Sequence, residues 1–276
     1  MKISRFFLLF LSMLVFVSYS YAAGVGNPIK PLGNMKFAVA GEANFNYGRD
    51  MDANGESTSG NSVNSLELAE ISQGYVKLIL GLSDFANIFA KVGTAKINGL
   101  DIKFFSGEGI TIESGGDFLY GFGGSLFYRL SREEMYFMDK YLNWYSDFDF
   151  FAGLNLDASF FNPDADEMTV AGESAANVSG ELKTREFQVS IFSGIEFHVD
   201  ENLSIVPYVN AFWNGLSLDT DGVRYDFDIL NFDTNAQDEF GAGVGLEVNL
   251  SENISFNIEG RFLGGNSVSF GATGKF

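Results

Sequence analysis

The sequence contains no cysteine and a single histidine, and its 17 Lys and Arg residues are outnumbered by 36 Asp and Glu residues. Without cysteine, the chain has no disulfide framework, no thiolate metal site and no thiol nucleophile. One histidine excludes mechanisms that need two imidazoles. The formal net charge of -19 argues against a nucleic-acid partner, because lysine and arginine are the side chains that bind phosphates. The sequence indicates no cofactor.

Long apolar runs are scarce as well. A mean hydropathy of +0.07 with 19% charged residues excludes a bundle of membrane-spanning helices. The exception is the apolar run at residues 6–17, which follows Lys2 and Arg5 and precedes Ser20-Tyr21-Ala22. A helix needs about 20 residues to cross a bilayer, so this run is too short. It predicts a secretory signal peptide over residues 1–22, with an uncleaved anchor as the alternative.

Residues 23–34 are predicted to form a flexible lead, and residues 35–276 a single domain of strands with two unlike faces. In residues 240–250, for example, the even-numbered positions are Phe, Ala, Val, Leu, Val and Leu, and the odd-numbered ones are Gly, Gly, Gly, Glu and Asn. Such period-two alternation is typical of strands. It predicts strands near residues 35–47, 66–80, 85–95, 117–130, 142–161, 185–199, 203–213, 239–250, 254–263 and 267–276.

The connections between these strands fall into two classes. Those at one end are mostly tight turns, such as residues 81–84, 200–202 and 251–253. Those at the other end are mostly long and acidic, and we expect them to be loops over residues 48–65, 96–116, 162–184 and 214–238. The parity of the second strand would place Glu70 on the apolar face, so we expect a β-bulge near Gly74.

A soluble β-sandwich also alternates, but its polar face meets water. Here the polar face is rich in glycine and aromatic residues, which suits a crowded barrel interior. Its members include Gly121, Gly123, Gly153, Gly194, Gly241, Gly243, Gly245, Phe127, Phe151, Tyr208 and Phe212. Long loops at one end and tight turns at the other are typical of outer-membrane barrels. The predicted fold is therefore all-β, a ten-stranded antiparallel transmembrane β-barrel, with eight strands as the alternative.

A signal peptide, amphipathic strands and a last strand that ends in Phe276 together resemble the small outer-membrane β-barrel proteins of Gram-negative bacteria, the porin-like and opacity-protein group. The resemblance covers residues 35–276 as an architecture. It implies location in the outer membrane, contact with outer-membrane lipid and lipopolysaccharide, and a C-terminal signal at Phe276 read by the barrel-assembly machinery. It implies no ligand.

Charged side chains on the inward face are the candidate functional residues. The basic ones lie on the early strands and the acidic ones on the later strands, apart from one arginine. They are Lys36, Lys77, Lys91, Arg129, Asp149, Glu196, Glu247, Glu259 and Arg261. Opposed charges either join across the lumen and plug it, or leave a wet channel with a transverse field. We expect a porin-like or structural protein with a narrow or plugged lumen. The alternative is a surface interaction protein that binds a partner through its acidic loops.

No catalytic site is predicted. His198 faces inward at the short-turn end, whereas barrel hydrolases of similar fold use a histidine at the outer rim, so an interior polar role is preferred. The glycine-rich segments at residues 121–124 and 241–243 do not complete a dinucleotide-binding pattern. Asp219 and Asp221 are weak candidates for a metal site, but they lack the twelve-residue calcium-loop spacing and are better explained as solvated acids. Such carboxylates could also be bridged by divalent ions to lipopolysaccharide phosphates.

Overall fold

The computed structural model describes residues 31–52, 55–57, 62–130, 148–175, 178–225, 228–237, 240–263 and 266–276. The predicted signal peptide, residues 1–22, lies outside the described residues. No helix with the length and apolarity to cross a bilayer occurs in the described part of the chain.

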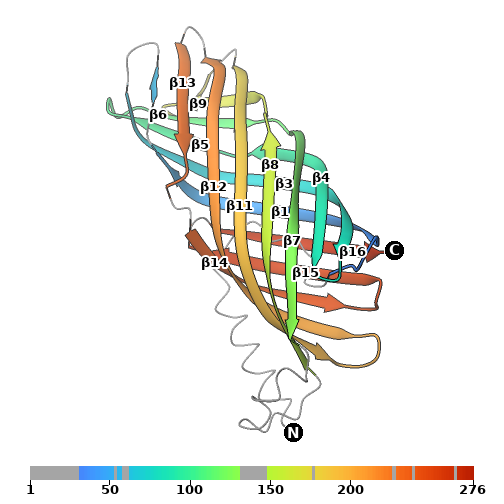
Figure 1. The fold of residues 1–276 in the computed structure, drawn as a ribbon. Coiled ribbons are helices and arrows are strands. Elements are labelled where there is room, and N and C mark those ends of the chain that lie inside the picture. The colour runs from blue at the N-terminus through green and yellow to red at the C-terminus, as the bar shows by residue number, and fades with distance from the viewer. Residues whose placement is uncertain are drawn as a thin grey trace.

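The main body is a closed ring of antiparallel strands (Figure 1). The ring strands are β1 (Phe37–Met51), β3 (Val63–Ser83), β4 (Ala86–Ile97), β7 (Asp117–Leu130), β8 (Phe148–Phe161), β11 (Ser179–His198), β12 (Ser204–Tyr225), β14 (Phe240–Asn249), β15 (Ile254–Phe262) and β16 (Asn266–Lys275). Each strand pairs with the next along this order, and β1 closes the ring by pairing with both β3 and β16. Every range predicted from the sequence overlaps one of these strands.

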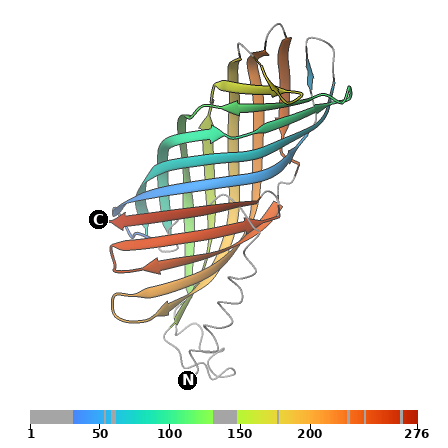
Figure 2. The same ribbon diagram turned by 180° about the vertical axis from the view of Figure 1, so that it is seen from behind.

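The long connections were predicted to be loops, and this was wrong for much of their length. They contain β2 (Gly55–Ser57), β5 (Leu100–Phe104), β6 (Gly109–Ser114), β9 (Ala165–Val170), β10 (Glu173–Ser174) and β13 (Asp228–Asn235). These strands and the adjoining ends of β3, β11 and β12 form what we call the extension. In Figure 2, β3, β5, β6 and β9 cross in front of β11, β12 and β13. These segments form strands rather than loops because their apolar residues alternate with polar ones and because their backbones pair with neighbouring strands.

The extension has two sides, and each is joined to the ring by hydrogen-bonded pairing of strands. On one side β5 pairs with β3, β6 with β5 and β9 with β6. On the other side β13 pairs with β12, and β2 pairs with β13. Because both groups continue ring strands, their geometry is fixed by the barrel beneath them.

A change of face occurs in β3, but not at Gly74 as the sequence suggested. Gly74 lies within unbroken ladders to both neighbouring strands. Leu68 and Ile71 are both buried although three residues apart, so the strand reverses its inward parity between them. Opposite them, Leu100 and Ile97 are both buried as well. Adjacent strands therefore reverse together, at the level where the polar barrel interior gives way to apolar side chains.

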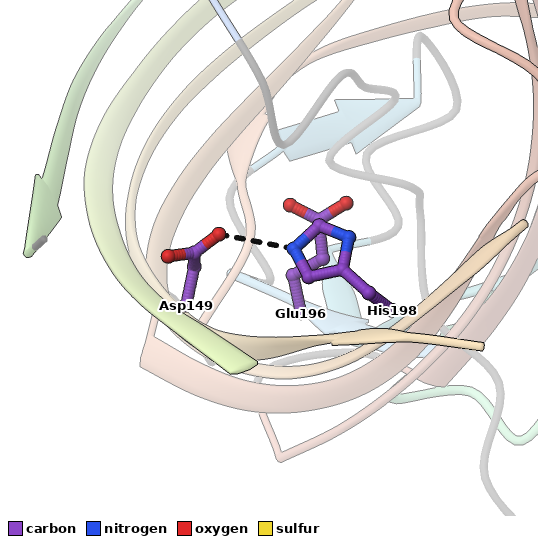
Figure 3. Close-up of side chains that lie close together, drawn as sticks. All are labelled: Asp149, Glu196 and His198. Atoms are coloured by element: carbon purple, nitrogen blue, oxygen red, sulfur yellow. Dashed lines mark hydrogen bonds and ion pairs between the residues drawn. The ribbon is translucent and has the colours of Figure 1, made fainter. Parts of the chain in front are cut away.

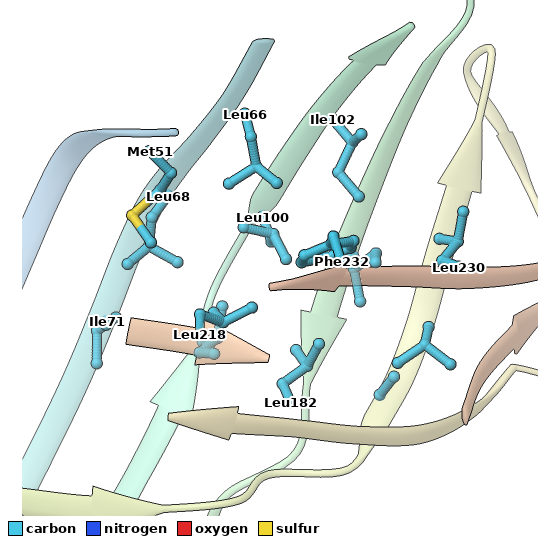
Figure 4. Packing of buried hydrophobic residues seen from close by; sticks show 14 of the residues in the cluster. Met51, Leu66, Leu68, Ile71, Leu100, Ile102, Leu182, Leu218, Leu230 and Phe232 are labelled. Atoms are coloured by element: carbon cyan, nitrogen blue, oxygen red, sulfur yellow. The ribbon is translucent and has the colours of Figure 1, made fainter. Parts of the chain in front are cut away.

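Above that level the two sides of the extension enclose an apolar core, which we call the apolar cap. Leu66, Leu68 and Leu100 face Leu218 and Phe232 from the opposite side (Figure 4). The cap comprises Met51, Val63, Leu66, Leu68, Ile71, Tyr75, Ala95, Ile97, Leu100, Ile102, Phe104, Ile110, Ile112, Leu119, Phe161, Ala165, Met168, Leu182, Leu216, Leu218, Val223, Leu230, Phe232 and Ala236. Each fully buried aliphatic side chain of this kind contributes about 1.5–3 kcal/mol. With all of these side chains buried, the cap fills the end of the barrel that carries the long connections.

Within the ring, inward glycines lie against inward aromatic rings. A methyl group added to Gly245 would lie 2.1 Å from Cζ of Tyr208, and one added to Gly194 would lie 2.5 Å from Cζ of Phe151. Gly153, Gly241 and Gly123 have the same relationship to Phe192, Phe212 and Phe89. The mixture of glycine and aromatic residues on the polar face is thus explained by shape, since each ring occupies the space a side chain would need.

Candidate functional site

The barrel interior below the apolar cap is filled by charged and polar side chains that contact one another. Along the strands from the short-turn end, these side chains form a mouth cluster, two buried ion-pair clusters and a layer that joins opposite walls.

The first buried cluster surrounds two lysines of β3 and β4. Lys77 Nζ lies 3.1 Å from Oε2 of Glu42 on β1 and 3.9 Å from Oδ2 of Asp157 on β8. Lys91 forms an ion pair with the same aspartate. The hydroxyl of Tyr75 donates to Oε2 of Glu42 at 2.8 Å. Two cations and two carboxylates therefore balance each other, as buried charges require.

The second buried cluster centres on Arg261 of β15, which is fully buried. Its Nε donates to Oε1 of Glu259 at 2.6 Å, and its Nη1 donates to Oε1 of Gln188 on β11 at 2.6 Å. The hydroxyl of Tyr208 on β12 donates to the other oxygen of Glu259 at 2.7 Å. The guanidinium also lies 4.5 Å from the ring centroid of Phe212, a cation–π distance. Arg261 therefore links β15 to β11, which are not neighbours in the ring.

A third group crosses the barrel just below the apolar cap. Gln73 Nε2 on β3 donates to Oε2 of Glu186 on β11 at 3.2 Å, and Asn214 Nδ2 on β12 donates to Oε1 of Glu186 at 2.9 Å. Arg49 Nη2 on β1 donates to the carbonyl oxygen of Asn214 at 2.9 Å, and its Nη1 lies 4.0 Å from Glu186. Neither β3 nor β1 neighbours β11 or β12 in the ring. These contacts therefore join opposite walls, and we call them the cross-lumen layer.

The mouth cluster lies at the short-turn end, where β7, β8 and β11 meet. Asp149 and Glu196 are direct cross-strand partners, and His198 follows two residues later on the same face. His198 Nε2 lies 3.0 Å from Oδ2 of Asp149 (Figure 3). Arg129 forms an ion pair with Asp149 and lies 3.1 Å from Oε2 of Glu196. Four ionisable groups thus converge at one entrance of the barrel.

The predicted inward charges are not all placed as expected. Lys77, Lys91, Glu247, Glu259 and Arg261 are buried in the interior, and Arg129, Asp149 and the buried Glu196 lie in the mouth cluster. Lys36 is exposed instead, because it lies at the rim of the barrel, one residue before β1 begins. The expected contrast between a basic and an acidic wall is replaced by local clusters, each of which contains both signs.

The interior residues that sequence reasoning missed are Glu42, Asp157 and Glu186, together with the polar partners Arg49 and Gln73. Glu42 and Asp157 share inward parity with residues that were predicted. That parity was the available signal. Their partners depend on strand tilt and on which walls face each other, and these are not encoded in period-two alternation.

The two weak metal candidates lie in the extension. Asp219 is a direct cross-strand partner of Asp233, and Arg185 Nη2 lies 3.9 Å from its Oδ2. Burial and the adjacent Asp233 carboxyl raise the pKa of Asp219. The backbone of Asp221 pairs with Glu181, and its side chain lies outside the described part of the structure. The raised pKa of Asp219 therefore reflects its burial first and the second carboxyl beside it next.

The outer surface of the ring is apolar. Exposed large hydrophobic side chains occur on all sides of it, including Val39, Val76, Leu78, Ile88, Val92, Phe122, Leu126, Leu156, Val189, Ile191, Val209, Phe256, Ile258 and Phe270. We call this surface the apolar belt. Toward the extension it meets a row of aromatic rings. Tyr120 and Phe160 are stacked with centroids 5.4 Å apart, and Phe160 and Phe187 pack edge to face with centroids 5.7 Å apart. The ring strands are therefore apolar outside and polar inside, the reverse of a soluble domain.

No protein-family model matches the chain, and no curated protein matches it. Solved structures with a similar fold include Neisserial surface protein A, with 12% identity, a TM-score of 0.29 and coverage of 87% of this chain and 97% of the other. The transport unit of the autotransporter AIDA-I from Escherichia coli has 8% identity, a TM-score of 0.36 and coverage of 87% and 89%. An outer membrane channel from Pseudomonas putida F1 has 12% identity, a TM-score of 0.37 and coverage of 91% and 99%. At these identities the similarities assign no activity to the chain.

Proposed function

We propose that this protein is an integral outer-membrane β-barrel of a Gram-negative bacterium, exported by a cleaved signal peptide, whose ten ring strands span the membrane and whose lumen is plugged. Its role is structural and non-enzymatic, as an anchor for the extension, and any passage of small solutes requires rearrangement of the plug. The observation that carries this proposal is the inverted polarity of the ring, an apolar belt outside and hydrogen-bonded charges inside.

The medium around the belt follows from the energetics of its side chains. Ile191 and Phe122 are 64% and 60% exposed, although both lie in the middle of ring strands. Contiguous exposed apolar surface on this scale is rare on soluble monomers and is the rule on barrels in lipid. A closed ring also leaves no sheet edge, which hydrocarbon requires because it offers no hydrogen bonds.

The plug rests on the contacts between opposite walls. The cross-lumen layer places Glu186 within reach of β1, β3 and β12, and the apolar cap lies beyond it. Ions that travel along the axis would have to break these contacts and then enter hydrocarbon. A permanently open diffusion pore is therefore disfavoured relative to a closed barrel.

Orientation and assembly complete the proposal. Both ends of the ring lie together, since Phe276 N donates to the carbonyl oxygen of Phe37. They lie beside the tight turns, since Met35 N donates to the carbonyl oxygen of Gly81 and Lys275 N to that of Asn253. By the arrangement general to outer-membrane barrels, the short turns face the periplasm and the extension faces outward among the lipopolysaccharide. Phe276, at the end of β16, would be the residue read by the barrel-assembly machinery.

Two measurements test the proposal. The purified mature chain should need detergent to remain monomeric and should migrate differently before and after boiling, as folded barrels do. In planar bilayers it should give no steady openings. A chain that remains monomeric without detergent would contradict membrane insertion, whereas steady ion-selective openings would contradict the plug alone.

A surface interaction function is the second candidate, and the extension itself favours it. The extension is an ordered structure with its own apolar core, and Phe105 at the β5–β6 turn is 73% exposed. If this tip binds a partner, cells that display the wild-type chain should adhere to immobilised matrix proteins, and Phe105→Ser should abolish adhesion without changing the amount of folded barrel. Equal adhesion by both chains would exclude the tip as the contact.

A further inference from the structure

The mouth cluster has the composition and geometry of a cation site. We propose that Asp149, Glu196 and His198 bind a first-row divalent transition ion such as Zn²⁺, and that the Arg129 guanidinium holds the two carboxylates when no ion is bound. The site goes beyond the proposed function, and its geometry does not depend on the medium outside the barrel.

The ligand atoms are already close together. One oxygen or nitrogen atom from each of the three side chains lies within 4.8 Å of the others. Figure 3 shows the three side chains pointing toward one another from neighbouring strands. Glu196 and His198 come from one face of β11 and Asp149 from the adjacent position on β8, so the sheet itself sets their spacing. Ligands around a zinc ion lie about 2.0–2.2 Å from it, which places them roughly 3–4 Å apart.

The charge of the cluster points to a cation independently of its spacing. Two carboxylates directly opposite each other on neighbouring strands repel, and Glu196 is only 2% exposed. A guanidinium already occupies the position between them, since Arg129 contacts both Asp149 and Glu196. With a neutral imidazole, the three ligands carry two negative charges, which a divalent ion neutralises and a single guanidinium does not.

Arg129 can leave this position more easily than the ligands can. Its side chain is 48% exposed at the mouth, compared with 3% for the side chain of Glu196. A bound ion would therefore displace the guanidinium toward solvent while the carboxylates stay in place. The imidazole sets the metal preference of the site, because nitrogen ligands favour zinc, nickel, copper and cobalt, whereas Ca²⁺ and Mg²⁺ prefer oxygen ligands alone.

The single histidine of the sequence makes a direct test possible in the wild-type chain. Detergent-solubilised protein without a polyhistidine tag is treated with diethylpyrocarbonate, and the imidazole modification is followed by absorbance. Saturating Zn²⁺ should slow modification of His198 at least tenfold, and the same concentration of Ca²⁺ should not. Equal rates with and without Zn²⁺ would overturn the proposal without any variant having to fold.

Titration with Co²⁺ then tests the ligand set. The wild-type chain should develop the visible absorption bands of a low-symmetry nitrogen- and oxygen-ligated ion, and Zn²⁺ should displace them. His198→Ala should weaken binding at least tenfold, because the loss of even an outer-shell partner costs about 10–100-fold. Arg129→Gln should tighten binding, since it removes the competing cation.

The matched control is Glu252→Gln, which removes an exposed carboxylate from another turn at the same end of the barrel. It should bind Co²⁺ as the wild type does. Unchanged affinity and spectrum in His198→Ala would overturn the site, as would weaker binding in Arg129→Gln. Retention of the boiled-versus-unboiled gel shift identifies the variants that have folded, and the protection experiment stands if one has not.

Discussion

Gln73 on β3 and Glu186 on β11 meet inside the barrel, where the amide of the first donates to the carboxylate of the second at 3.2 Å. The two strands are separated in the ring by β4, β7 and β8. The contact is therefore a brace between walls rather than an interaction within one sheet face. Because Asn214 and Arg49 converge on the same carboxylate, Glu186 is the centre of this brace.

Glu186→Ala should destabilise the folded barrel by about 3 kcal/mol, because removing one partner of a buried ion pair leaves the desolvation of the other uncompensated. Urea unfolding followed by tryptophan fluorescence in detergent measures the change. Glu181→Gln, an exposed position on the same strand, is the control and should change stability by less than about 0.5 kcal/mol. Equal stability of both variants would show that water, not Glu186, balances the charge of Arg49.

Gly245→Ala should destabilise the barrel by about 1–3 kcal/mol, because the new methyl group would lie 2.1 Å from Cζ of Tyr208 and the ring must move away from Glu259. The control is Gly41→Ala on β1, where an added methyl group meets nothing within 4 Å. The same unfolding assay compares them. In a Tyr208→Ala background the penalty at Gly245 should largely vanish, and a penalty that persists would assign the effect to the backbone.

Leu218→Ala should loosen the extension, because Leu218 is completely buried in the apolar cap. Core substitutions of this type cost about 2–5 kcal/mol. Limited proteolysis should cut the extension faster in this variant while the ring remains intact on gels. Leu126→Ala, which removes an exposed belt side chain, serves for comparison. Equal cleavage rates would mean that the extension does not depend on the cap for its order.

Ile191→Lys tests the medium around the belt. At 64% exposure in water, the substitution should change stability by only about 0.5 kcal/mol. In lipid it should cost about 2–4 kcal/mol, falling toward the membrane surface. Folding yield into phospholipid vesicles, compared with that of Ser217→Lys on the outer side of β12 in the extension, distinguishes the two media. A neutral effect at Ile191 in vesicles would contradict its contact with hydrocarbon.

Asp219→Asn should stabilise the extension at neutral pH. A carboxyl whose pKa is raised on folding binds its proton more tightly in the folded chain, so stability falls as pH rises from its ordinary value through the folded pKa. The variant removes the repulsion from Asp233, worth roughly 0.5–1 kcal/mol for a cross-strand pair. Urea unfolding at pH 7 should show the gain, and below both pKa values the gain should disappear. A loss of stability at pH 7 would mean that the contact with Arg185 dominates.

The positions and polarity of the ring strands were predictable, because period-two alternation is a local property of the chain. Glu42 and Asp157 could be assigned to the interior in the same way, but not to Lys77. That assignment needs the tilt of the strands, which sets the axial level at which β1, β3 and β8 present their side chains. Lys36 illustrates the opposite limit, since its parity is inward but it lies at the rim of the barrel, one residue before β1 begins.

The extension was harder to predict for a physical reason. Ile110 and Ile112 alternate with polar residues as ring residues do, but β5 and β6 are short and are joined by a turn at Gly107, which has a φ of 89°. Short segments between turn residues are equally typical of loops. Besides pairing with each other, β5 pairs with β3 and β6 with β9, and these two ladders attach the hairpin to the rest of the sheet. Such non-local pairing is invisible to a local pattern.

The pairing of β1 with β16 has a consequence for biogenesis. Ten consecutive residues of the first ring strand, Ala38 to Tyr47, pair with β3 on one side and with the last strand, Asn266 to Lys275, on the other. Because β16 is the last ring strand to be synthesised, the ring cannot close before translation of this segment is complete. Until β16 has been made, one side of β1 has no partner strand, and the ring stays open along that side.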